Sequence, residues 1–136
     1  MASEPKTKPT DVPVDDFIAS VEHPRRRADA AVVRDLLAEI TGEKPVMWGP
    51  SIIGYGGYKG PTGDWPIIGF SPRKANLVLY MMNGFAGSAE LLDRLGPHKT
   101  GGSCLYLTTL DKADMSVLRT LAEQSVAHMR AKHPAA

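Results

Sequence analysis

Aromatic side chains are the clearest candidates for chemistry, and two of them lie in segments with strand-like patterns. Residues 77–82 form an unbroken apolar run that contains Tyr80, and residues 103–109 contain Tyr106. Successive side chains of a strand point to opposite faces of its sheet. If the two strands are neighbours, Tyr80 and Tyr106 share one face, and Cys104 lies on the same face. Three further aromatic residues are expected to reach the rim of this face: Trp48, Tyr55 and Trp65.

Such a face suits a small molecule or a protein partner, because tyrosine and tryptophan combine an apolar ring with a polar tip. A second layer of core and a homodimer interface are the alternatives. Arg73 and Lys74 precede the first of these strands, and His98 and Lys99 precede the second. Basic side chains and the backbone N–H groups of glycines bind anions, so these turns are the best place for a phosphate or carboxylate. Ordinary exposed turns are the alternative interpretation.

Cys104 and His98 are the candidates for catalysis. A cysteine acts as a nucleophile only when its pKa is lowered and a base lies nearby. His98 is close in sequence, but no acidic partner is marked, so a structural thiol is the simpler interpretation. An enzyme of unknown reaction that uses Cys104 or His98 is retained as an alternative function.

Metal ligands are sparse in this sequence. One cysteine and four scattered histidines provide no pair at the spacing of a zinc site. Hard ions such as iron prefer carboxylate oxygens, and the N-terminal helix offers Asp15, Asp16 and Glu22. Charged, solvated helix faces explain these acids without a metal, and weak iron binding by the three carboxylates is the alternative.

Helices are expected at both ends of the chain and strands in the middle. Residues 14–21 and 24–41 have helical apolar periodicity, and Gly42 supplies a left-handed stop. The basic run Arg25-Arg26-Arg27 is expected to be solvated surface, with an anion or nucleic-acid contact as the alternative. Strands are expected at 46–48, 52–53, 65–70, 77–82 and 103–109, a mobile hairpin loop at 54–64, and further helices at 88–95 and 115–132.

The order α-α-β-β-β-β-α-β-α favours an α+β fold over an alternating α/β fold. We expect an antiparallel or mixed sheet of four to five strands with helices mainly on one face. The length of 136 residues and the hydrophobic content of 43% fit a single domain at 12–132, preceded by a flexible N-terminal lead at 1–11.

Composition excludes several classes of function. A formal net charge of +1 gives no concentrated basic face for nucleic acid. No apolar stretch approaches the roughly 18 residues of a membrane-spanning helix, so no membrane partner is expected. The single cysteine excludes an internal disulfide and favours a reducing cytoplasm.

Several separated blocks, in this order, resemble the YdhG-like domain-of-unknown-function family over about residues 10–132. The blocks are Trp48-Gly49, Trp65-Pro66, Gly69-Phe70-Ser71-Pro72-Arg73-Lys74, Leu95-Gly96, His98-Lys99-Thr100-Gly101, Ser103-Cys104-Leu105-Tyr106 and Leu110-Asp111. The resemblance implies a sheet packed by helices and, for some members, a role as a frataxin-like iron chaperone. Gly102 stands where the family has a second basic residue, so an anion site that used that residue is not implied here.

The leading hypothesis is a non-enzymatic module that binds a ligand or partner with its aromatic sheet face and basic rim. No resident cofactor is expected, and iron delivery through Asp15, Asp16 and Glu22 is the second hypothesis. The expected ligand-binding residues are Trp48, Tyr55, Trp65, Arg73, Lys74, Tyr80, Lys99, Cys104 and Tyr106.

Overall fold

The computed structural model describes residues 9–49, 51–60, 63–81, 85 and 87–133. Within this part of the chain, four α-helices and a six-stranded antiparallel sheet form an α+β fold, as predicted. The strand order of the sheet is β1-β2-β5-β6-β8-β7, and β3 and β4 form a separate hairpin. None of the described helices is long and apolar enough to cross a membrane.

Short strands that contain glycine are the main departure from the expected elements. The segment 54–64 contains a two-stranded hairpin rather than only a loop, and the loop before the last expected strand contains an edge strand. Glycine is depleted in strands, so these three-residue segments have no clear strand pattern. The strands are β1 (Val46–Trp48), β2 (Ile52–Tyr55), β3 (Tyr58–Gly60), β4 (Gly63–Trp65), β5 (Ile68–Pro72), β6 (Leu77–Met81), β7 (Lys99–Gly101) and β8 (Cys104–Leu107).

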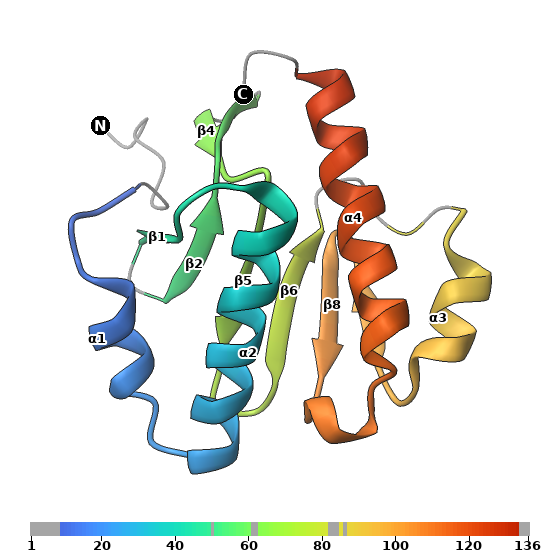
Figure 1. The fold of residues 1–136 in the computed structure, drawn as a ribbon, viewed down its shortest axis with the longest axis horizontal. Helices are drawn as coiled ribbons and strands as arrows, with labels where there is room; N and C mark the ends of the chain where they lie inside the picture. The colour runs from blue at the N-terminus through green and yellow to red at the C-terminus, as the bar shows by residue number, and fades with distance from the viewer. Residues whose placement is uncertain (1–8, 50, 61–62, 82–84, 86, 134–136) are drawn as a thin grey trace.

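The helices cover one face of the sheet. Helices α2 and α4 lie side by side across this face, with α1 next to α2 and α3 next to α4 (Figure 1). This arrangement agrees with the prediction that helices pack mainly on one side. The helices are α1 (Val14–Ala19), α2 (Pro24–Thr41), α3 (Ala89–Leu95) and α4 (Met115–Lys132), with a 3-10 turn at Leu110–Lys112.

Local signals account for the ends of the two long helices. The ring of His23 accepts a hydrogen bond from the Arg26 N–H at 3.2 Å, which caps the start of α2. Gly42 ends α2 with a φ of 69°, a left-handed conformation in which glycine is favoured. Asp114 caps α4 by accepting hydrogen bonds from backbone N–H groups in the first turn of the helix.

The core lies between the sheet and the helical layer. Alternate strand residues point toward the helices and are almost completely buried, as the period of a strand requires. They meet the apolar stripes of α2 and α4, whose buried members recur at helical spacing. The strand residues of this core include Ile53, Tyr55, Ile68, Phe70, Leu77, Leu79, Met81, Leu105 and Leu107.

The edge of the sheet at β1 is extended by the segment that precedes α1. Pro9 forms a bridge with Trp48, and the Thr10 N–H donates to the Met47 carbonyl oxygen at 2.8 Å. The predicted flexible lead at 1–11 therefore includes two residues that pair with the sheet. The rest of that prediction falls mostly on residues 1–8, which lie outside the described part of the chain.

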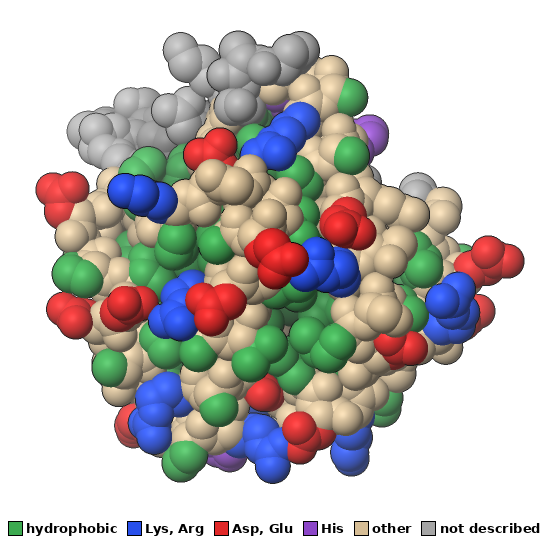
Figure 2. Space-filling model, in the orientation of Figure 1, with side chains coloured by type: hydrophobic (Ala, Val, Ile, Leu, Met, Phe, Trp, Pro, Cys, Tyr) green, Lys and Arg blue, Asp and Glu red, His purple; other side chains and the backbone are tan. Residues whose placement is uncertain are grey.

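Ion pairs connect the helices on their outer surface. Arg34 of α2 lies 3.0 Å from the Asp15 carboxylate of α1, and Arg119 of α4 lies 2.7 Å from the Glu39 carboxylate of α2. Figure 2 shows this side of the molecule, where acidic and basic side chains are interspersed. Several positive charges on the helical side are thus paired with neighbouring acids.

Candidate functional site

The two tyrosine-bearing strands are neighbours, as the sequence pattern predicts. β6 pairs with β8, and the register places Tyr80 opposite Cys104 and Val78 opposite Tyr106. The alternate residues of both strands are buried against the helices, so these four side chains belong to the face that the helices leave uncovered. Lys99 of β7 pairs with Tyr106 and extends the same face. These five residues form the aromatic face, and all of them except Val78 are at least partly exposed.

Glycines flank the central pair of the aromatic face. Gly69 lies opposite Tyr80, and Gly101 lies opposite Cys104. A Cβ atom at Gly69 would lie 2.8 Å from the Ile53 carbonyl oxygen, so only glycine allows β2 and β5 to approach this closely. The neighbours of Tyr80 and Cys104 in the adjoining strands therefore carry no side chain, and a Cβ at Gly101 would lie 3.6 Å from the Tyr106 ring.

Arg73 reaches the aromatic face from the turn between β5 and β6. Its guanidinium donates a hydrogen bond to the Tyr80 hydroxyl, and its Cζ lies 5.9 Å from the centroid of the Tyr80 ring. This distance is within the range of a cation–π interaction. Burial raises the pKa of Tyr80, and the positive charge of Arg73 opposes that rise. The pair thus presents a neutral phenol beside a positive charge.

Tyr106 is linked to Cys104 on the same strand. A side-chain hydrogen bond with Cys104 is the main cause that raises the pKa of Tyr106. The two residues are two positions apart on β8, with Leu105 between them, which places their side chains on one face. The phenol of Tyr106 is therefore a neutral hydrogen-bonding group at neutral pH.

A cavity of about 370 Å³ lies beside Tyr106, at the end of the sheet where β6 begins and β8 ends. The ring of His98 is held at its mouth, because His98 Nδ1 lies 2.8 Å from the Gly96 carbonyl oxygen. Since that oxygen can only accept, Nδ1 carries the proton of this bond. The described lining residues are Ala75, Asn76, Pro97, His98, Lys99, Tyr106, Leu107 and Thr108.

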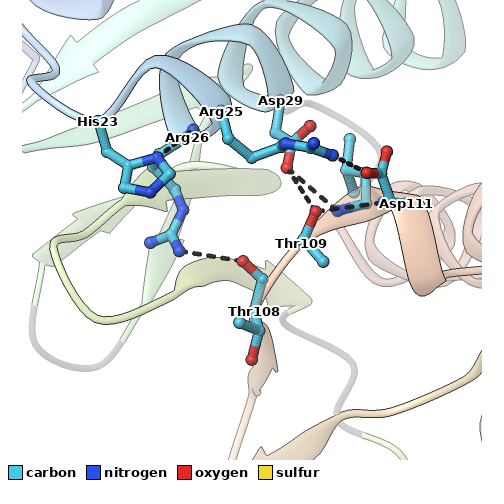
Figure 3. Close-up of polar contacts among 8 residues, drawn as sticks. His23, Arg25, Arg26, Asp29, Thr108, Thr109 and Asp111 are labelled. Carbon is cyan, nitrogen blue, oxygen red and sulfur yellow. Dashed lines mark hydrogen bonds and ion pairs between the residues drawn. The ribbon is translucent and has the colours of Figure 1, made fainter.

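Arg26 holds the two segments on either side of this end of the sheet. Its guanidinium donates to the Arg73 carbonyl oxygen at 2.5 Å and to the Thr108 carbonyl oxygen at 3.0 Å. Figure 3 shows the Arg26 side chain reaching from the first turn of α2 to the end of β8. Only 6% of Arg26 is exposed, so the expectation that the whole basic run is solvated surface was wrong at this residue.

Asp29, one helical turn after Arg26, also binds the segment that follows β8. Its Oδ2 accepts hydrogen bonds from the Leu110 N–H at 3.1 Å and the Thr109 hydroxyl at 3.4 Å (Figure 3). Arg25 of the same turn is exposed and forms an ion pair with Asp111. The start of α2 is thus bound to the segment that follows β8, from Thr108 to Asp111.

Three aromatic residues expected at the rim have different positions. Tyr55 lies in the core and donates a hydrogen bond to the Arg34 carbonyl oxygen of α2 at 2.6 Å, so its expected place at the rim was wrong. It belongs to the alternate set of β2 residues that face the helices. Trp48 lies against Gly54 and is 4% exposed, which leaves little of its ring for a ligand. Trp65 is partly exposed on the separate hairpin, where it pairs with Tyr58.

The basic residues of the rim are exposed. Arg73, Lys74 and Lys99 form no ion pair within the described part of the chain. Lys74 stands in the same turn as Arg73 and next to Ala75 of the cavity. These cations are therefore available to a negatively charged group, in contrast to the paired cations of the helices.

The geometry does not favour catalysis by Cys104 and His98. His98 precedes Lys99, which pairs with Tyr106, so His98 lies level with Leu107. Leu107 lies three positions along the strand from Cys104, a distance of roughly 10 Å at about 3.3 Å per residue. Direct proton transfer between the two side chains would need hydrogen-bond distance.

The predicted iron ligands are exposed and lie near the N-terminal helix. Asp15 is paired with Arg34, and Asp16 and Glu22 are exposed in α1 and in the connection to α2. Among the described residues, no group of three or more His, Cys, Asp or Glu side chains could hold a metal ion. The structure therefore adds no support to iron binding by these three carboxylates.

Sequence reasoning missed Arg26 and Asp29, although their spacing contains a signal. The buried positions of α2 include Arg26, Ala30, Val33 and Leu37, which recur every three or four residues. Extending the apolar stripe backward by one turn would have placed Arg26 on the face that packs against the sheet. No comparable signal marks Asn76 and Thr108, which line the cavity from beyond the strand ends.

No protein-family model, curated protein or solved structure matches the chain. Membership of the YdhG-like family therefore stays a prediction that depends on the sequence blocks alone.

Proposed function

We propose that this protein is a non-enzymatic binding module that takes a small ligand on its aromatic face. The observation that carries the proposal is the register of β6 and β8, which brings Tyr80, Cys104 and Tyr106 together on the side without helices. Exposed tyrosine rings provide apolar area with a polar tip, a combination common in binding sites. The single cysteine and the YdhG-like sequence blocks agree with a small protein of the reducing cytoplasm.

The surroundings of the tyrosines support binding rather than catalysis. Arg73 lies over Tyr80, and Lys99 lies beside Tyr106, so both rings have a cation within reach. Within the described residues, the register places His98 roughly 10 Å along the sheet from Cys104, too far to act directly as the base of an activated nucleophile. The site can therefore orient a ligand by stacking and by charge, without a group placed to transform it.

The test is a titration of ¹⁵N-labelled protein with phenol and indole, followed by NMR chemical shifts. We expect shifts centred on β6 and β8, and a Tyr80→Leu, Tyr106→Leu double variant that binds about threefold to tenfold more weakly, as the loss of aromatic contacts implies. Bound indole should also slow the alkylation of Cys104 by iodoacetamide, because the thiol shares the face.

Tyr58→Leu is the matched control, because Tyr58 is also partly exposed but lies on the separate hairpin, stacked on His133. Equal weakening by the control, or shifts confined to the helices, would contradict the proposal. Sedimentation that shows a stable dimer, lost on Tyr106→Arg, would instead assign the aromatic face to self-association.

A further inference from the structure

The cavity at the end of the sheet is continuous with the aromatic face. Lys99 and Tyr106 belong to both, and Asn76 and Thr108, which stand just before β6 and just after β8, line the cavity beside them. A ligand on the Tyr106 ring can therefore extend directly into the cavity.

The lining of the cavity has the character of an anion site. Lys99 supplies a positive charge, and Asn76 and Thr108 supply an amide and a hydroxyl that can donate hydrogen bonds. None of the described lining residues carries a carboxylate. His98 Nδ1 donates to the Gly96 carbonyl oxygen, so Nε2 of the neutral ring can accept a hydrogen bond but cannot donate one to the anion.

The walls of the cavity are held in place before any ligand arrives. Arg26 is bonded to the carbonyl oxygens of Arg73, in the turn that leads to Asn76 and β6, and of Thr108, which lines the cavity just after β8. A site whose polar groups are fixed in advance loses less conformational freedom on binding. The buried Arg26 therefore acts as a positioning residue, and it does not face the ligand.

We propose that this cavity binds the anionic group of a small planar molecule whose ring lies on Tyr106. The proposal rests on the proposed function and adds the class of ligand, a phosphate or carboxylate attached to a flat ring. A volume of about 370 Å³ lies near the lower end of small-molecule pockets, roughly 300–1,000 Å³, and fits one ring with one anionic group.

The experiment compares four probes by NMR titration: phenyl phosphate, benzoate, phenol and inorganic phosphate. Phenyl phosphate or benzoate should bind at least about tenfold more tightly than phenol, with shifts at Lys99, Tyr106 and Thr108. Whichever of the two binds more tightly identifies phosphate or carboxylate as the preferred anion. Raising the salt from about 20 mM to about 500 mM should weaken the anionic probes and leave phenol unchanged, because ions screen exposed charges.

Two variants separate this proposal from the proposed function. Lys99→Ala should weaken the preferred anionic probe about tenfold and phenol by less than about threefold, because phenol carries no charge for Lys99 to pair with, while Arg119→Ala, which removes a cation from the helical side, should change neither. Equal binding of phenol and the anionic probes, or anion binding that Lys99→Ala does not weaken, would overturn the anion site while the aromatic face stayed a binding surface. An absence of binding by all four probes would overturn both.

Discussion

At the scale of single residues, Arg26 is a buried charge that is satisfied by backbone carbonyl oxygens. Its bonds to the carbonyls of Arg73 and Thr108 replace the hydration that the guanidinium loses. Its Nε has no hydrogen-bond partner within the described part of the structure. Burying Arg26 therefore costs free energy of folding. Replacing it would destabilise the fold further, because two carbonyl oxygens would lose their donor.

Replacing Arg26 should destabilise the fold much more than replacing its neighbour. We expect Arg26→Met to lower the free energy of unfolding by about 2–4 kcal/mol, as breaking a buried polar network does. Arg25→Ala, which removes an exposed ion pair in the same helical turn, should cost less than about 1 kcal/mol. Urea unfolding of both variants measures the difference, and similar losses would mean that the Arg26 bonds contribute little.

Tyr55 should make the protein sensitive to alkaline pH. Burial raises the pKa of Tyr55 well above its ordinary value. The unfolded chain, with a tyrosine pKa of about 10, then loses its proton first as the pH rises. The contribution of the Tyr55 phenol to the free energy of unfolding is fully present below about pH 10. It falls as the pH increases toward the raised pKa of the folded state.

Tyr55→Phe should therefore be less stable at pH 8 and less sensitive to alkali. At pH 8 the variant loses the bond to the Arg34 carbonyl, about 1 kcal/mol. Between pH 8 and pH 10.5 it should lose less stability than the unmodified protein in urea unfolding. Tyr58→Phe, at a less buried phenol, is the control and should change this pH dependence less. An unchanged pH dependence in Tyr55→Phe would contradict the role of its burial.

At the scale of elements, the glycines of the sheet differ in what their neighbours allow. Gly69 lies in the central strand β5, where a Cβ would meet the Ile53 carbonyl oxygen at 2.8 Å. Gly101 lies in the edge strand β7, where a Cβ would meet only the Tyr106 ring, at an ordinary 3.6 Å. The two positions belong to one row of the sheet, on either side of Tyr80 and Cys104.

Alanine substitution tests this difference. Gly69→Ala should destabilise the protein by about 1–3 kcal/mol, because the backbone of two paired strands must move to admit a methyl group. Gly101→Ala should be neutral within about 0.5 kcal/mol. Thermal unfolding of the two variants gives the comparison, and a tolerant Gly69 would show that β2 and β5 can separate without cost.

At the scale of the whole molecule, the helical layer and the face opposite it could be predicted from the sequence. The apolar period of α2 and α4 identifies the residues that cover the sheet, and strand alternation separates Tyr80 and Tyr106 from the core set. The same alternation, applied to β2, would have placed Tyr55 with Ile53 on the covered side. That error arose because glycines on both sides of Tyr55 made the segment resemble a loop.

The cavity could not be predicted, because the contacts that shape it join distant parts of the chain. Arg26 is separated by 47 and 82 residues from the two residues whose carbonyls it binds. No local pattern reports such a pairing, since it depends on how α2 is placed across the sheet. The edge strand β7 was missed for a related reason, because only its pairing with β8 reveals it.

The uneven pairing of charges has a consequence for the rate of association. On the helical side, cations such as Arg34 and Arg119 are matched by acids, while Arg73, Lys74 and Lys99 have no acidic partner within the described residues. A chain with a net charge of only +1 can thus present a locally positive potential at one end of its sheet. Diffusing anions would be steered toward that end, and their capture would slow as added electrolyte shortens the range of attraction.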